Sequence, residues 1–167
     1  MKKTLILVLA ILALSAYAYS EVKIGVINSQ EIVMKTKRGK QIQAKLENLQ
    51  KSKSSQLKTL NDQIKQLEKE LLSPALNAAT REKKSLDLQT KRTNFKRNYE
   101  DAQRDVQRES QKELLNLEKE LIPLIEGVGK SKGYTLIFDR ARSGIIFAGP
   151  SIDITAEIIS AVDAKYK

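Results

Sequence analysis

The sequence predicts a mostly helical α+β fold in which a long antiparallel α-helical coiled-coil hairpin projects from a small β base. Three observations lead to this prediction. Apolar residues recur at intervals of three and four over most of the chain, which is the spacing of a coiled-coil seam. The dipeptide Ser73-Pro74 breaks this periodic region once, near its middle. Short β-branched and aromatic segments lie only near the two ends of the chain, at 22–28 and 134–149, so the strands must meet in one base.

The first 18 residues have the pattern of a secretory signal peptide. Lys2 and Lys3 precede an apolar run at 4–14, which is too short to span a membrane, and small residues follow at 16 and 18. We expect cleavage after Ala18 and export to a bacterial envelope; an uncleaved membrane anchor is the alternative. Loss of the two lysines lowers the net charge from +10 to +8. A basic protein that is exported is not expected to bind nucleic acid.

The segment VKIGVIN, at 22–28, is the first predicted strand. Val22, Ile24 and Val26 share one face of it, as in a half-buried strand. Asn28 stands three residues before Glu31, which is the pattern of an N-cap with a reciprocal carboxylate. A helix is therefore predicted to begin at Asn28.

Two heptad stripes follow, each with one polar interruption. The first runs over 42–71 and has a stutter at Lys53; the second runs over 95–128 and has a stutter at Ser110. A stutter locally relaxes a left-handed supercoil, so the arms are expected to bend there. Glycines predict the end of the second helix, at positions Gly127, Gly129 and Gly133.

Pro74 cannot continue the helical hydrogen-bonding pattern, so the first helix must end near it. A narrow apolar stripe has to be covered, and the nearest cover is the second helix folding back. We therefore predict a hairpin arm over 29–129 with its tip near 73–79. A single kinked rod, covered along its length by a partner chain, is the alternative.

The last segment completes the base. YTLIFD (134–139) and GIIFAG (144–149) are predicted as two further strands, and the helix that follows has one apolar face made of Ile154, Ile158 and Val162. Asp153 or Thr155 is expected to cap this helix. The base, made of 19–28 and 130–167, is small and apolar on both sheet faces, so it is expected to form the oligomer interface. The interface residues predicted from the strands are Ile24, Val26, Leu136, Phe138 and Phe147.

Charge is concentrated in the distal half of the hairpin. Between Lys51 and Tyr99 there are twelve basic and five acidic residues, a net of +7. A basic surface of this kind attracts anionic material, although solvation of the coiled coil is the better explanation of any single lysine.

No enzymatic or cofactor chemistry is expected. The chain has no histidine and no cysteine, which removes the commonest metal ligands and nucleophile–base pairs. In GVGKSKG, Leu124 stands where a phosphate-binding loop needs its first glycine. The sequence therefore predicts no enzyme, no metal site and no cofactor.

The arrangement resembles the Skp/OmpH family of periplasmic chaperones. The resemblance rests on KIGVINSQEI after a signal peptide, the long charged hairpin, YTLIFD and the closing DITAEIISAV. It implies a homotrimer in the periplasm, with a small β-barrel body and three helical arms around a cavity that holds unfolded outer-membrane proteins without ATP. Anionic lipid or lipopolysaccharide is a further candidate ligand, and a structural coiled-coil spacer or tether is the alternative function. Client binding is expected to be diffuse and to involve the basic arm residues Lys58, Lys65, Lys69, Arg81, Lys83, Lys84, Lys91, Arg92, Lys96 and Arg97.

Overall fold

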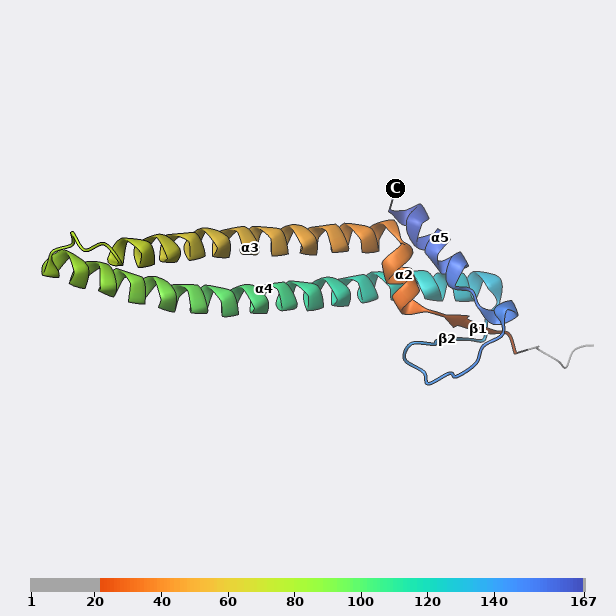
Figure 1. Ribbon diagram of the computed structural model, residues 1–167. Helices are drawn as coiled ribbons and strands as arrows, with labels where there is room; N and C mark the ends of the chain where they lie inside the picture. Colours follow the sequence, from red (N-terminus) through yellow and green to blue (C-terminus); the bar gives the residue numbers. More distant parts are fainter. Residues whose placement is uncertain (1–21, 167) are drawn as a thin grey trace, which may run out of the picture.

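The computed structural model describes residues 22–166, so the predicted signal peptide lies outside the described residues. The chain forms two long helices that run side by side and meet a small mixed base at one end (Figure 1). The order of elements is β1 (Ile24–Ile27), α2 (Ser29–Lys35), α3 (Lys37–Leu71), α4 (Ala78–Lys132), β2 (Leu136–Asp139), the 3-10 helix η2 (Pro150–Ile152) and α5 (Thr155–Lys165). This arrangement confirms the predicted fold class.

The proline break is the tip of an antiparallel hairpin. Helix α3 ends at Leu71, and α4 begins after Asn77, whose side chain accepts a hydrogen bond from the Thr80 amide at 2.8 Å. The Arg81 guanidinium donates to the carbonyls of Leu71 at 2.7 Å and Ser73 at 3.0 Å, so it satisfies acceptors left over where α3 ends. At 1.5 Å per residue, the 35 residues of α3 extend about 50 Å from the base.

The first helix is not continuous, which corrects the prediction of a single break. Asn28 caps α2 as predicted, accepting from the Glu31 amide at 3.2 Å, but Glu31 pairs with Lys35 instead of completing a reciprocal box. Thr36 then adopts an extended conformation and separates α2 from α3, and its buried hydroxyl accepts from the Gly39 amide at 3.1 Å. A side chain at Gly39 would place Cβ 1.6 Å from the Val33 carbonyl oxygen, so this corner requires glycine.

The base contains a two-stranded parallel sheet. Ile24 is opposite Leu136 and Val26 is opposite Phe138, so these four side chains share one face, while Ile27 on the other face joins the core. The third strand predicted at 144–149 is absent from the described chain: this segment has no strand partner. Two local bonds explain the difference. The Asp139 carbonyl accepts from the Arg142 amide at 3.0 Å and from the Ser143 amide at 2.9 Å, closing a turn that leads the chain away from β2.

The other side of β1 is occupied as well, because Val26 bridges to Asp153 and its carbonyl accepts from the Ile154 amide at 2.9 Å. Both edges of β1 are therefore occupied, and the outer edge of β2 is the one place in this sheet where GIIFAG could pair. Ile146 and Phe147 are left 101% and 84% exposed.

Helix α5 packs across the root of the arm, and its apolar face is the one predicted. The Asp153 carboxylate accepts from the Thr155 amide at 2.9 Å, and the Thr155 hydroxyl accepts from the Asn28 amide, also at 2.9 Å. Every helix of the base contributes to one core. Its buried members are Ile27, Ile32, Ile42, Leu117, Leu121, Ile154, Ile158 and Val162.

Helix α4 ends at the last of the three glycines named from the sequence. Gly127 and Gly129 lie inside it, and only Gly133 ends it, with a left-handed φ of 71°. Pro123 also lies inside α4, where it cannot donate the amide hydrogen bond that would reach back to the carbonyl of Lys119.

Candidate functional site

The distal halves of α3 and α4 carry the predicted basic surface, and the structure divides it into two groups. In the first group, which we call the open basic set, every side chain is on an exposed residue, and within 22–166 none forms an ion pair. Its members are Lys58, Lys65, Lys69, Lys83, Lys96 and Arg97. Lys58 and Lys65 are one heptad apart, and Lys83 and Arg97 are two, so each pair lies on one face of its helix.

The other four predicted residues form contacts within the hairpin. Lys84 forms an ion pair with Glu70, and Arg92 pairs with Glu68 at 2.6 Å. Lys91 donates to Gln63 at 3.1 Å, and the contacts of Arg81 with the tip carbonyls are given above. The hydrogen bond from Lys84 lowers the pKa of Glu70. Exposed pairs of this kind contribute little to stability, but they do occupy these four side chains.

Two hollows lie between the arm helices near the middle of the arm. Lys53, the predicted stutter position in α3, forms an ion pair with Asp105 at 2.6 Å, and this hydrogen bond lowers the pKa of Asp105. Hollows of about 330 Å³ and about 590 Å³ flank the contact, and Leu57 and Ala102 line both. Ser110, the second stutter position, lines the larger hollow. The polar stutters therefore lie beside hollows between the arm helices.

At the base, four of the five predicted interface residues are exposed: Ile24, Leu136, Phe138 and Phe147. Val26 is only 3% exposed, because the segment around Asp153 already covers it. Val26 therefore packs within its own chain, which removes it from any exposed surface of the single chain.

A second apolar surface at the base escaped the sequence analysis. A groove of about 920 Å³ lies between α2, α4 and the segment after β2, and Met34, Leu114, Leu115 and Ile122 are the exposed apolar side chains along it. A sequence signal for it exists: Leu115 and Ile122 are seven residues apart, one position after the main stripe of Leu114 and Leu121. Exposed apolar surface on this scale is typical of an interaction site.

The described residues show no arrangement suited to catalysis at a metal. Within 22–166 no three side chains of the metal-binding types gather in one place. In the same range, no helix combines the length and apolar composition needed to cross a membrane. The fold and its surfaces thus define an arm-bearing helical-hairpin protein with a small mixed base.

The chain belongs to the OmpH-like outer membrane protein family, whose model matches residues 23–162. It is 25% identical over 156 residues to a Skp-like protein of Pseudomonas aeruginosa, and the match covers 92% of each chain. Its fold is similar to a crystal structure from Caulobacter crescentus CB15, described as a candidate outer membrane chaperone (OmpH-like). The TM-score is 0.79 at 22% identity, covering 89% of this chain and 88% of that one.

Proposed function

We propose that this protein is an ATP-independent holdase chaperone of the periplasm that binds unfolded outer-membrane proteins between its helical arms. The observation that carries the proposal is the open basic set, which places on the distal arm six exposed basic side chains that form no ion pair within 22–166. An acidic unfolded chain is drawn to this surface by long-range attraction and held by many weak contacts. The periplasm has no ATP, so capture runs on binding energy alone.

A cavity requires several arms, and we propose a homotrimer assembled through the base. The exposed sheet face of Ile24, Leu136 and Phe138 supports this, as does the outer edge of β2, which is unpaired in the two-stranded sheet of the described chain. The unpaired segment at 144–149 is rich in β-branched and aromatic residues. Added to the β2 edge of a neighbouring subunit, it would extend the sheet toward a closed barrel.

Clients differ in size, so the arms must adapt. The hollows on either side of the Lys53–Asp105 ion pair support bending at the middle of the arm. The open basic set also suits anionic lipid or lipopolysaccharide as a second ligand, since both carry the same sign of charge as an acidic client. The proposal includes removal of residues 1–18 on export.

Suppression of aggregation tests the function. A urea-unfolded β-barrel membrane protein is diluted into buffer with the mature chain and no nucleotide, and light scattering is followed. We expect aggregation to fall as the chaperone approaches one trimer per client. The control replaces residues 45–106 by a short turn; Lys45 contacts Glu109 at 2.6 Å, so the cut ends lie side by side. Unchanged aggregation with the intact protein would instead support a spacer or tether.

A further inference from the structure

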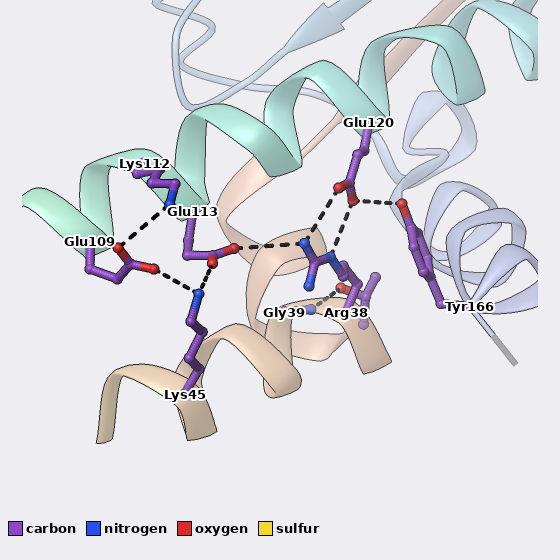
Figure 2. A network of polar contacts seen from close by, with 9 residues as sticks. Arg38, Gly39, Lys45, Glu109, Lys112, Glu113, Glu120 and Tyr166 are labelled. Carbon is purple, nitrogen blue, oxygen red and sulfur yellow. Dashed lines mark hydrogen bonds and ion pairs between the residues drawn. The ribbon is translucent and has the colours of Figure 1, made fainter. Parts of the chain in front are cut away.

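Three helices that are far apart in the sequence converge where the arm leaves the base (Figure 2). Arg38 in the first turn of α3 donates to Glu120 of α4 through Nε at 3.2 Å and Nη2 at 3.4 Å. Arg38 also approaches Glu113 at 3.6 Å, and the side chain of Glu113 is only 8% exposed. The hydroxyl of Tyr166, just after α5, donates to the same Glu120 carboxylate at 2.5 Å.

A second contact joins α5 to the arm on the other side of Arg38. The carboxylate of Asp163 accepts from the backbone amide of Lys37, the first residue of α3, at 2.7 Å. Helix α3 has no acidic residue in its own first turn. A carboxylate at a helix N-terminus satisfies an amide donor and complements the positive end of the helix dipole, so α5 supplies a group that the arm helix lacks.

These contacts lie beside two interruptions of helical hydrogen bonding at the arm root. Thr36 separates α2 from α3 two residues before Arg38. In α4, Pro123 interrupts the helical hydrogen bonds three residues after Glu120. Helices bend where such interruptions occur. Because Arg38 contacts Glu120, both interruptions lie at the same level of the arm.

The geometry points to a role for the C-terminal helix as a brace that sets the direction of the arm and hence the width of the client cavity. Tyr166 and Asp163 are its positioning residues. The leverage is large, because a rotation of ~10° at the root moves the tip of a 50 Å arm by about 9 Å. This inference rests on the proposed holding function for its consequence, but the brace itself is a property of the single chain.

The core, and not the brace, holds the base folded. Ile32, Ile158 and Val162 are fully buried and hold α2 and α5 in the base without Tyr166 or Asp163. Removing the brace should therefore widen the range of arm directions and leave the base folded.

Distance measurements between two spin labels test this. The chain has no cysteine, so labels are placed only where cysteines are introduced: Ser52→Cys on the arm and Ala156→Cys at the start of α5, both exposed and remote from the brace. Labelled subunits are diluted with unlabelled protein, so that each distance lies within one chain. The brace is removed by Tyr166→Phe, which deletes one hydroxyl, together with Asp163→Ala, which deletes the oxygen that accepts from the Lys37 amide. Tyr99→Phe is the matched control, because Tyr99 is exposed and lies outside the brace.

We expect the distance distribution to broaden in the double variant and to broaden less in each single variant. It should not broaden in Tyr99→Phe. The helical content should be the same in all of these variants. A labelled client should also leave the double variant several-fold faster. An unchanged distribution in folded protein overturns the brace. A broadened distribution with an unchanged release rate overturns its link to holding. If the parent protein holds no client, the proposed function fails, and the distances still decide whether the brace exists.

Discussion

The hydroxyl of Tyr166 lies 2.5 Å from Oε2 of Glu120, a residue 46 positions earlier in the chain. The same carboxylate accepts two hydrogen bonds from Arg38. One side chain of α4 thus joins the start of the arm to the end of the protein. The contact places the C-terminus of the described chain at the arm root, a position that the sequence did not predict.

The first prediction concerns pH. The hydrogen bond from Tyr166, followed by the hydrogen bond and charge of Arg38 and the charge of Lys165, lowers the pKa of Glu120. A lowered folded-state pKa contributes stability that is present above the ordinary glutamate value and is lost as the pH falls through the folded value. The pKa of Tyr166 is raised by Glu120, so its contribution is present below the ordinary tyrosine value and lost at higher pH.

Glu113 and Asp163 also face this cluster. We therefore expect the brace to be intact between the acidic and the strongly alkaline ranges and to loosen at both extremes. The label distances, recorded against pH, should broaden below about pH 4 and again above about pH 10, because the contact between Glu120 and Tyr166 needs an ionised glutamate and a protonated tyrosine. In Glu120→Gln, the acidic broadening should be smaller than in the parent protein; if it persists unchanged, Glu120 is not the group responsible.

The second prediction concerns the corner between α2 and α3. Gly39→Ala brings Cβ to 1.6 Å from the Val33 carbonyl oxygen, so the backbone must move. We expect a loss of about 3 kcal/mol or more in the free energy of unfolding, at the upper end of overpacking effects. The matched change Gly127→Ala, at a helical site with nothing within 4 Å, should stabilise by roughly 0.5–1 kcal/mol. Urea denaturation measures both, and equal effects would contradict a tight corner.

The third prediction concerns the middle of the arm. Asp105→Asn removes the charged partner of the half-buried Lys53, so it should lower the urea midpoint. Replacing both residues with leucine should restore or raise the midpoint, because a well-packed apolar pair avoids the cost of desolvating two charges. It should also stiffen the arm and narrow the range of client sizes that are held. A stiffened arm that holds all clients equally well would show that bending at the stutter is unnecessary.

The fourth prediction separates steering from solvation. Reversing Lys83 and Arg97 of the open basic set to glutamate should slow association with an acidic unfolded client and weaken its dependence on salt, with a smaller effect on dissociation. Reversing Lys40 and Lys119, exposed near the arm root, changes the net charge equally and serves as the control. Stopped-flow fluorescence measures both rates. If the two double variants slow capture to the same extent, net charge acts without regard to position.

The fifth prediction concerns assembly through the base. Phe138→Asp and Phe147→Asp should each shift the oligomer toward monomer, because either change places a charge in an apolar contact. Leu86→Asp makes the same change at an exposed leucine of the arm and should leave assembly intact. Sedimentation velocity gives the answer. The variant with residues 45–106 replaced by a turn should remain oligomeric, and a monomeric result would place the interface in the arms.

The sequence by itself determined the helical hairpin, because the signals for it are local. The heptad spacing, Pro74 and Asn77 act on residues within a few positions of themselves, and the apolar face of Ile154, Ile158 and Val162 follows from one helical period. The positions of the stutters, Lys53 and Ser110, follow from the local spacing for the same reason. The pairing of Lys53 with Asp105 does not.

Tertiary structure alone decided the corner at Thr36, the loss of the strand at 144–149 and the convergence on Glu120. The corner depends on how closely the Gly39 backbone approaches the Val33 carbonyl, and helix propensities of single residues carry no information about that distance. A strand needs an available edge, and whether one exists depends on which segments have already paired with β1. Arg38, Glu120 and Tyr166 are ordinary surface residue types in the sequence. They form a network only because the folding of the hairpin and the packing of α5 close loops of 82 and 46 residues between them.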